Sequence, residues 1–393
     1  MKVYLDHAAT TALDKRVLKK MLPFMTEAFG NASSLHSFGR EALAAVDEAR
    51  DEIARILHCS PKEIYFTSGG TESDNWAIRG VVSARKGDGK HIVTTKIEHP
   101  AVLETCRELE RQGYAVTYVN VGADGRVKTE DIISAVRPDT VLVTVMFANN
   151  EVGSVQPIAE IGRFCREKGI VFYTDAVQAM GSIPIDVKDM NIDMLGFSAH
   201  KFHGPKGVGA LYVRSGVKCD RLMFGGEQER GKRAGTLNVP GIVGMAEALR
   251  LVAEETEENN ARILRVRDRF VERVTAEIPD CVLNGGKENR LVGNANFRFE
   301  GVSGEALLTL LDINGIAASG GSACSSGSTE PSHVIMALGG SEQDALSSVR
   351  FSFGKENTPE EVDYVVDVLK KSLEKLRSKT NLFKIVPEKG KYV

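Results

Sequence analysis

The sequence is poor in cysteine and tryptophan and has no paired-cysteine motif. Its 393 residues include a single tryptophan and six cysteines, and consecutive cysteines lie at least 43 positions apart. This spacing excludes a CxxC zinc site or dithiol site. Because no export signal accompanies the cysteines, the sequence also predicts reduced thiols and a cytoplasmic location. Five of the six are expected to be small buried side chains.

Long hydrophobic runs and an excess of one charge are also missing. The longest apolar stretch, around 141–148, is about 12 residues too short for a membrane helix. Asp6 interrupts the N-terminal segment before a signal-peptide core could form. Fifty basic residues face 53 acidic ones, a formal net charge of −3. This balance excludes binding of nucleic acid or membrane surfaces by bulk electrostatics, so we expect no membrane and no direct nucleic-acid partner.

The composition is that of a globular protein of two or three domains. Apolar residues make up 42% of the chain and charged residues 26%, which excludes extensive disorder. A folded chain of this length buries roughly 75% of the surface that its unfolded form exposes. The protein is therefore large enough for a substantial core.

Short β-branched runs alternate with helical patterns over the first half of the chain. This alternation predicts an α/β domain with a mostly parallel sheet sandwiched by helices. We expect helices at 39–57, 73–85 and 158–168. The expected strands are 64–67, 91–95, 115–119, 140–147, 170–174, 194–198 and 208–213.

The pattern changes in the second half of the chain. A long helix is predicted over about 240–278, with Pro240 in its first turn, where a missing N–H costs nothing. The last helix should begin with a capping box formed by Thr358 and Glu361. We expect a large domain over 15–255 and a smaller α+β domain formed by 1–14 and 256–393. The strands expected in the smaller domain are 295–299, 316–318 and 348–353.

Lys201 is the first candidate for chemistry. It follows the apolar strand 194–198 in the segment GFSAHKFHGPKG, at the edge of a parallel sheet where ligands bind. A partly desolvated lysine there can lose its proton and condense with an aldehyde to form an imine. The alternative is an ordinary lysine of a surface loop, since lysines are mostly exposed.

Three further candidates lie at predicted strand ends. Asp175 could hold a proton on a pyridine nitrogen, or it could cap the next turn. The junction TSGGTES at 67–73 has glycines and a helix start at Thr71, which favour a phosphate; a tight turn is the alternative. His99 could stack on an aromatic ring or relay protons, and a structural histidine fits equally well.

Cys324 and Arg350 are candidates in the second half of the chain. Cys324 lies in the Gly/Ser-rich segment 319–328, where a thiol can be exposed, form a thiolate and travel. An incidental cysteine in a linker is the alternative. Arg350 alternates with apolar neighbours on a predicted strand and could bind a carboxylate through two hydrogen bonds. A structural salt bridge is an equally good interpretation of Arg350.

Together these segments resemble the cysteine desulfurases of the IscS/NifS type, in the class-V aminotransferase family of fold-type I, aspartate aminotransferase-like pyridoxal-phosphate enzymes. The resemblance runs almost end to end. It rests on ten segments in family order: YLDHAATT (4–11), GNASSLH (30–36), FTSGGTESDN (66–75), EHPAV (98–102), ANNEVGSVQPI (148–158), TDAVQAMG (174–181), SAHKFHGPKGVGALY (198–212), ERGKRAGTLNVPGIVG (229–244), SGGSACSSGSTEPSHVI (319–335) and VRFSFG (349–354).

The resemblance implies roles for the matching residues. Lys201 would carry the cofactor aldehyde, Asp175 would pair with the ring nitrogen, and His99 would stack on the ring. Arg350 and Asn150 would bind the substrate, and Cys324 would be the nucleophile. Thr236 would reach the phosphate of the neighbouring subunit, which implies a homodimer. The remaining cofactor-binding residues would be Asn150 and Gln178 at the ring hydroxyl, and Gly70, Thr71, Ser198 and His200 at the phosphate.

The implied reaction converts L-cysteine to L-alanine and leaves the sulfur as a persulfide on Cys324. Lys201, helped by His99, would move the protons. The sulfur would pass to an acceptor protein, such as an iron–sulfur scaffold or a tRNA-thiolation enzyme, and so serve iron–sulfur cluster, thio-cofactor or tRNA biosynthesis. No intrinsic metal site is implied, although Cys324 could transiently ligate a cluster shared with a scaffold.

Two rival functions stay open on the sequence alone. One is another fold-type I enzyme, a selenocysteine lyase or an aminotransferase. The other is a non-catalytic assembly subunit, which the joint presence of Lys201, Asp175 and Cys324 argues against. The long SACSS-type loop favours the IscS/NifS group over the SufS group. The tail 381–393 lacks the histidine-bearing end of the family, so the partner stays undefined.

Overall fold

The chain forms two compact units, which are described separately. The computed structural model describes residues 1–320 and 330–384, with side chains as far as Ser378. The small unit comprises Met1–Ala9, Glu151–Gly153 and Glu258–Val393, and the large unit comprises Thr10–Asn150 and Ser154–Glu257. The domain limits expected from the sequence stay a prediction. Cys324 lies outside the described residues.

A seven-stranded sheet forms the centre of the large unit. Its strands follow the order β2-β8-β7-β6-β5-β3-β4. β8 runs antiparallel to its neighbours β2 and β7, and the other neighbouring pairs are parallel. The predicted, mostly parallel seven-stranded sheet is therefore confirmed. Its members are β2 (Ile64–Thr67), β3 (His91–Thr95), β4 (Ala115–Val119), β5 (Thr140–Thr144), β6 (Val171–Asp175), β7 (Met194–Ser198) and β8 (Gly209–Val213).

The strand limits agree with the prediction to within one residue, except at the end of β5. The strand predicted over 140–147 ends at Thr144. Beyond this residue the chain continues along β6, because the N–H groups of Val145 and Phe147 donate to the carbonyl oxygens of Tyr173 and Asp175 at 3.2 and 2.8 Å. These hydrogen bonds to β6 keep residues 145–147 in the buried sheet, which explains why the apolar pattern continues beyond the end of β5.

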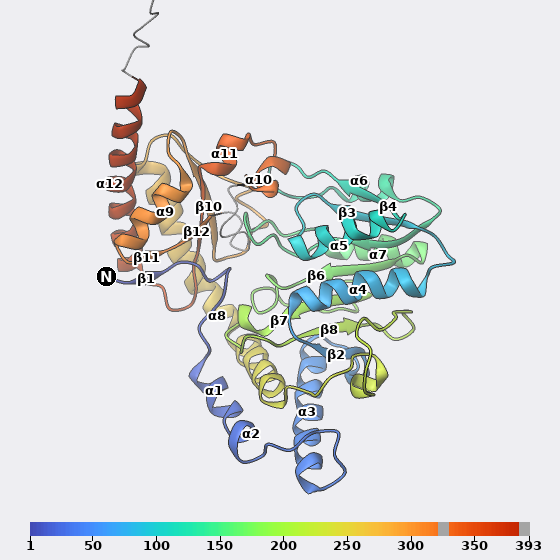
Figure 1. The fold of residues 1–393 in the computed structure, drawn as a ribbon. Coiled ribbons are helices and arrows are strands. Elements are labelled where there is room, and N and C mark those ends of the chain that lie inside the picture. The colour runs from blue at the N-terminus through green and yellow to red at the C-terminus, as the bar shows by residue number, and fades with distance from the viewer. Residues whose placement is uncertain (321–329, 385–393) are drawn as a thin grey trace, which may run out of the picture. The chain divides into compact units, whose positions relative to one another are not determined.

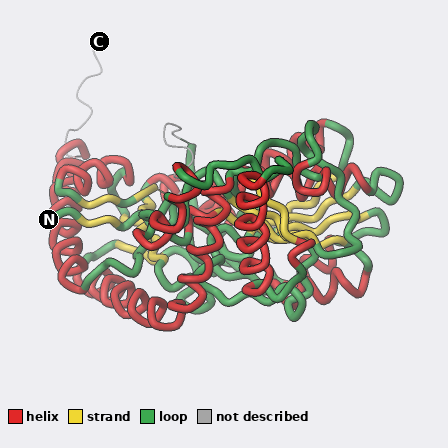
Figure 2. Tube along the Cα trace, turned by 90° about the horizontal axis from the view of Figure 1, so that it is seen from below, coloured by secondary structure: helices red, strands yellow, loops and turns green. Residues whose placement is uncertain are grey.

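Helices lie on both sides of these strands (Figures 1 and 2). α4 and α5 pack on one face through a core that includes Ile78, Val102 and Leu142. The single tryptophan, Trp76, is buried in α4, where Nε1 donates to the carbonyl oxygen of Asp220 at 2.9 Å. The helices preceding Ser198 are α1 (Lys15–Met21), α2 (Pro23–Thr26), α3 (Ser37–Ile56), α4 (Gly70–Ala84), α5 (Pro100–Arg111), α6 (Thr129–Ala135) and α7 (Ile158–Lys168).

The start of α4 differs from the prediction. The apolar periodicity predicted a helix from residue 73, but α4 begins at Gly70. Gly69, the N-cap residue, has φ of +152°, which a side chain would disfavour. The Glu72 carboxylate accepts the N–H of Ser68 at 2.8 Å and so closes the first turn. Backbone freedom at Gly69 and this local hydrogen bond thus extend α4 by one turn at its start, and the residues of this turn lack the apolar periodicity used to predict helices.

The small unit is an α+β unit, as predicted. Its main sheet is antiparallel with the order β12-β13-β10-β9, and β1 pairs with β11 in a separate parallel ladder. Phe270, Phe297 and Phe351 belong to its core. The strands are β1 (Val3–Tyr4), β9 (Cys281–Leu283), β10 (Asn294–Phe299), β11 (Ile316–Ala317), β12 (Ser319–Gly320) and β13 (Ser348–Ser352).

The helices after residue 230 also follow the sequence signals. The long helix α8 (Val239–Glu277) begins one residue before the predicted start. Thr358 Oγ1 accepts the N–H of Glu361 at 3.3 Å, and Glu361 Oε2 accepts the N–H of Thr358 at 3.2 Å, which confirms the capping box. In the part of the chain that the structure describes, no helix is long and apolar enough to cross a membrane. The other helices are α9 (Gly304–Ile313), α10 (His333–Ala337), α11 (Glu342–Leu346) and α12 (Pro359–Lys384).

A buried ion pair fixes an unusual turn before α8. Glu229 and Arg230, in η3 (Gln228–Gly231), have φ angles of 47° and 59°, which cost free energy for residues other than glycine. The Glu229 carboxylate binds both terminal nitrogens of Arg50 at 2.7 and 2.9 Å and accepts the N–H of Phe66 at 2.9 Å. This polar network holds the turn against α3 and β2.

We predict that Glu229→Ala lowers the free energy of unfolding by about 3–5 kcal/mol, because it leaves Arg50 buried without its partner. Chemical denaturation measures this loss. The matched control is Glu52→Ala in the exposed Glu52–Arg55 pair, whose loss should cost at most about 1 kcal/mol. Equal losses in the two variants would contradict the role assigned to Glu229.

Candidate active site

The predicted site residues of the large unit follow four strands that end at one edge of the sheet. From β3 the chain proceeds to β4 at one side, whereas from β5 it proceeds to β6 and β7 at the other. The strand order therefore reverses between β3 and β5, and open α/β sheets bind ligands at such a point. His99 follows β3, Asn150 follows β5, Asp175 ends β6, and Lys201 follows β7.

A backbone cradle lies at the start of α4. A Cβ atom on Gly69 would lie 3.5 Å from Ser198 Oγ, and one on Gly70 would lie 2.6 Å from Cγ2 of Val177. The absence of a side chain at Gly70 lets the helix start approach the segment that follows β6, and Gly69 lies near the end of β7. The first N–H groups of a helix of this length attract anions. The cradle therefore fits a phosphate, as predicted for Gly70 and Ser198.

His200 lies beside this cradle as a neutral imidazole. Its pKa is lowered to about 4, mainly by burial and further by the positive charges of Lys201 and Lys206. Nδ1 lies 3.1 Å from Oγ1 of Thr10. The hydroxyl of Thr11 donates to the carbonyl oxygen of His200 at 2.9 Å. The sequence interpretation included both threonines in the segment YLDHAATT but gave them no role.

Asp175 is the buried carboxyl of the site. Its side chain is on the end of β6, and Oδ1 accepts the N–H of Val177 at 2.9 Å. Burial raises the pKa of Asp175, whereas the neighbouring His99 and Lys201 side chains lower it electrostatically. His99 and Lys201 therefore lie close enough to Asp175 to interact with it electrostatically. The sequence interpretation requires this proximity.

His99 caps the helix that follows it. It is the N-cap residue of α5, and its Nδ1 accepts the N–H of Ala101 at 3.2 Å. Because a backbone N–H must donate, Nδ1 must be unprotonated, and the neutral ring carries its proton on Nε2. Pro100 at the first helical position leaves no N–H to satisfy there. The cap thus fixes both the ring and its tautomer.

Two buried acids behind Asp175 were missed by the sequence interpretation. Burial raises the pKa of Asp74 well above its usual value, and the charge of Asp175 adds to this effect. The Tyr173 hydroxyl donates to Asp74. Burial raises the pKa of Glu98 to about 8, against the opposing hydrogen bonds from Thr95 and the backbone, and Asp175 raises it further. Glu98 follows a strand and resembles a loop acid in the sequence, so only the fold reveals its burial.

The described residues fit a phosphorylated pyridoxal group. The glycine cradle suits its phosphate, because Gly69 and Gly70 offer N–H donors without a Cβ in the way, and the neutral His200 imidazole can add a hydrogen bond. Asp175 suits a protonated ring nitrogen, because a buried carboxylate needs a positive partner. Lys201, half-buried after the next strand, is the amine on the same edge of the sheet.

The other predicted residues are less closely defined. Thr71 and Thr236 are exposed, and Gln178 is half-buried three residues after Asp175. In the small unit, Arg350 on β13 is buried, and its Nη2 donates to Oδ1 of Asp6 at 2.9 Å. The salt bridge left open by the sequence thus exists, and the substrate-binding role of Arg350 stays a prediction.

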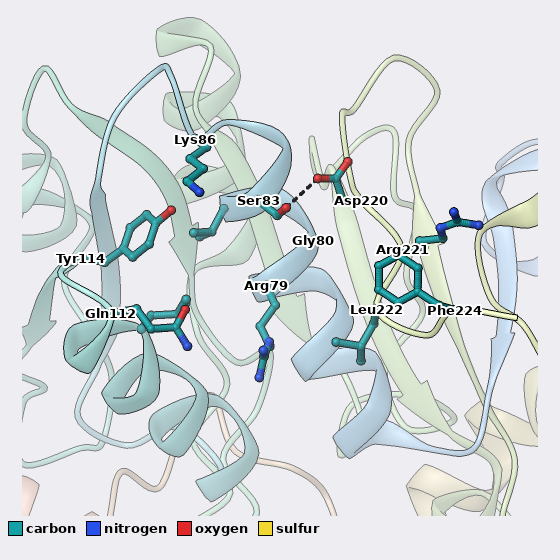
Figure 3. A pocket seen from close by; sticks show the side chains of 12 residues that line it. Arg79, Gly80, Ser83, Lys86, Gln112, Tyr114, Asp220, Arg221, Leu222 and Phe224 are labelled. Atoms are coloured by element: carbon teal, nitrogen blue, oxygen red, sulfur yellow. Dashed lines mark hydrogen bonds between the residues drawn. The ribbon is translucent and has the colours of Figure 1, made fainter.

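A separate surface cleft lies at the far end of α4 (Figure 3). It has a volume of about 460 Å³ and is lined by Arg79, Lys86 and Phe224, among other residues. The Ser83 hydroxyl donates to the Asp220 carboxylate at 2.6 Å across it. The last turns of α4 lie roughly 15–20 Å along the helix from its start. None of the predicted site residues lines this cleft.

Comparisons with known proteins connect this geometry to a family. The class-V aminotransferase family model matches residues 3–365. A cysteine desulfurase IscS of Clostridium botulinum (strain Hall) is 51% identical over 384 residues, 97% of each chain. A cysteine desulfurase IscS of Methanosarcina thermophila is 52% identical over 97% of this chain and 94% of its own.

Solved structures agree in fold over most of their length. A NifS-like protein has a TM-score of 0.90 and 40% identity, and the match covers 95% of this chain and 100% of that one. The structure described as SspA in complex with cysteine has a TM-score of 0.80 and 38% identity, with 91% of this chain and 100% of that one covered.

The fold and the site define a fold-type I enzyme that depends on pyridoxal phosphate. The chain belongs to the class-V aminotransferase family. Members of this family depend on pyridoxal phosphate, so the cofactor prediction made from the sequence is confirmed.

We predict that Glu98 makes the stability of the cofactor-free protein depend on pH. The folded-state pKa of about 8 exceeds the unfolded value of about 4.3, so folding binds a proton between these values. The free energy of unfolding should therefore fall as pH rises across this window. Glu98→Gln removes this contribution, so as pH rises the urea midpoint of the wild type should fall relative to that of the variant. If the two midpoints change in parallel with pH, the assignment is contradicted.

Proposed function

We propose that the protein is a pyridoxal-phosphate-dependent cysteine desulfurase that converts L-cysteine to L-alanine. The observation that carries the proposal is the juxtaposition of Lys201, Asp175 and His99 beside the phosphate cradle. The named relatives, at about half identity over nearly the whole chain, support the same activity. The large domain, 15–255, binds the cofactor, and the small domain, 1–14 and 256–393, carries the nucleophile.

The bound cofactor supplies an electron sink for the α-carbon of the substrate. Asp175 keeps a negative charge at the ring nitrogen, while His99 holds the ring from one side. The Lys201 amine takes and returns protons close to the cofactor, with His99 as its helper. Gly70, Thr71, Ser198 and His200 bind the phosphate, and Asn150 and Gln178 bind at the ring hydroxyl.

The substrate and its sulfur are handled by three residues. Arg350 binds the carboxylate of L-cysteine, and Asp6 holds the guanidinium in place through their 2.9 Å ion pair. Asn150 completes the substrate contacts. The Cys324 thiolate attacks the sulfur of the substrate, so that the carbon–sulfur bond breaks, a persulfide forms on Cys324, and L-alanine leaves.

We predict that Cys324→Ala retains the yellow colour of the bound cofactor and loses desulfuration by at least ~100-fold, because the nucleophile is gone. Sulfide and alanine released from L-cysteine with a reductant are the measured quantities. Cys281→Ala is the matched control, since Cys281 is a half-buried free thiol of the same unit, and it should keep full activity. A fully active Cys324→Ala variant would overturn the proposed reaction.

The protein acts as a homodimer in this proposal. Exposed apolar side chains recur along the segment from α1 to the start of α3, and Phe29 contacts Phe38 there with ring centroids 5.8 Å apart. Exposed patches of this kind mark interaction surfaces, and a second copy is the partner that we propose. The exposed Thr236 would reach the cofactor phosphate of that copy. The patch comprises Leu18, Leu22, Met25, Phe29, Leu35 and Phe38.

We predict that mixed dimers of Lys201→Ala and Thr236→Val subunits regain activity. If Thr236 serves the neighbouring site, one site of the mixed dimer has both native residues, so about half of the wild-type activity returns. Co-expression with two affinity tags isolates the mixed dimer, which is assayed at limiting cofactor. Activity no higher than half that of the Thr236→Val dimer would contradict a role in trans.

The acceptor of the sulfur is a second protein in this proposal, such as an iron–sulfur scaffold or a tRNA-thiolation enzyme, and Cys324 could transiently ligate a cluster shared with a scaffold.

A cytoplasmic location stays a prediction from the sequence. The alternatives are selenocysteine lyase or aminotransferase activity. The Cys324→Ala variant separates the aminotransferase alternative, because transfer of an amino group to a keto acid does not need this thiol.

A further inference from the structure

β3 and β5 lose their common backbone ladder just before the turns that carry His99 and Asn150. Paired residues between these strands end at Val93 and Val143. Beyond them, the chain from β3 bonds towards β4, with the N–H of Lys96 on the carbonyl oxygen of Val119 at 3.1 Å. The chain from β5 bonds towards β6, as described above. The two turns therefore follow different neighbours at the reversal of strand order.

Two buried side chains bridge these turns. Glu98 has 0% of its surface exposed, and its carboxyl oxygens lie 2.9 and 3.1 Å from the backbone nitrogen of Met146, which donates to them. The hydroxyl of Thr95 donates to Oε1 of Glu98 at 2.5 Å. Asn149 also has 0% exposed, and its Nδ2 donates to the carbonyl oxygen of Ile97 at 2.9 Å. The Glu98 side chain reaches from the His99 turn to the Asn150 turn, and the Asn149 side chain reaches in the opposite direction.

The bridges act on the residues that follow them. Glu98 directly precedes His99, and Asn149 directly precedes Asn150, so each anchor lies one Cα–Cα step of about 3.8 Å from a site residue. Loss of either bridge leaves a buried backbone group without its partner, which costs about 1–3 kcal/mol. The turns can recover part of that loss by moving apart, and such a movement displaces the ring and the amide that they carry.

We propose that Glu98 and Asn149 are positioning residues, which hold the turns of His99 and Asn150 at a fixed separation across the reversal of strand order. The inference rests on the proposed function, in which both turns face the cofactor ring. Glu98 and Asn149 act through the backbone. A displacement of about 1 Å at reacting groups can lower a rate 100-fold.

The test compares Glu98→Leu with Glu98→Gln. Leucine fills a similar volume without an acceptor, whereas glutamine keeps one oxygen for Thr95 and Met146. The control is Gln156→Leu, because Gln156 is buried and its side chain makes a comparable tie to a segment that carries no predicted site residue: it accepts the N–H of Val127 and donates to the carbonyl oxygen of Gly125, both at 2.9 Å.

In Glu98→Leu holoenzyme, kcat should fall about 10–100-fold, while KM for L-cysteine changes less than about threefold, since Arg350, which binds the substrate carboxylate in the proposed function, belongs to neither bridge. The visible circular dichroism of the bound cofactor, which reports the orientation of its ring, should weaken. Amide hydrogen exchange of residues 145–150 should accelerate in the cofactor-free protein. Glu98→Gln should restore most of each signal, and Gln156→Leu should lose stability without losing the dichroism.

An unchanged dichroism band and kcat in Glu98→Leu would overturn the inference, as would equal losses in the Gln156→Leu control. If Glu98→Leu does not fold, Asn149→Ala removes the second bridge and is judged by the same outcomes. Failure of the proposed function is distinguishable, because the wild-type protein would then release no sulfide from L-cysteine or bind no cofactor.

Discussion

The charge balance around the buried carboxyl of Asp175 is the constraint on which the site depends. A buried carboxylate is costly unless positive charge and hydrogen bonds compensate it. His99 and Lys201 lower its pKa, while burial raises the pKa values of Asp74 and Glu98 and so disfavours further negative charge beside it. In the proposed function, the Asp175 carboxyl is the negative partner of the protonated ring nitrogen.

The phosphate end of the site uses a different kind of positive potential. His200 is neutral at physiological pH because its pKa is about 4, so it acts as a hydrogen-bonding group. The partial positive charge comes from the N–H groups at the start of α4, which Gly69 and Gly70 leave accessible. Thr10 and Thr11 hold His200 in place. In the proposed function, fixed dipoles therefore complement the phosphate without depending on a titrating histidine.

Much of this arrangement could be predicted from the sequence, because strand runs and turn residues are local signals. β2, β3, β4 and β7 have the predicted limits, Asp175 ends β6, one residue beyond the predicted strand end, and Lys201 follows β7 as expected. Apolar periodicity alone placed the start of α4 at residue 73, because the first turn depends on Gly69 and a hydrogen bond, whereas the small residues of the junction indicated a start at Thr71, one residue from the observed Gly70. The burial of Glu98 was missed because its partner Met146 lies 48 residues away. The Arg50–Glu229 pair joins residues 179 positions apart, and no local pattern marks it.

The single tryptophan has a consequence for spectroscopy. Trp76 lies on α4, the helix that begins at the phosphate cradle. Its ring packs edge-to-face with the ring of Tyr65, and the two ring centroids lie 5.5 Å apart. Because the indole is buried and its nitrogen is anchored to the Asp220 carbonyl, it provides one rigid donor for energy transfer to the coloured cofactor. Quenching of the Trp76 fluorescence can therefore report what fraction of the protein has cofactor bound, without any engineered label.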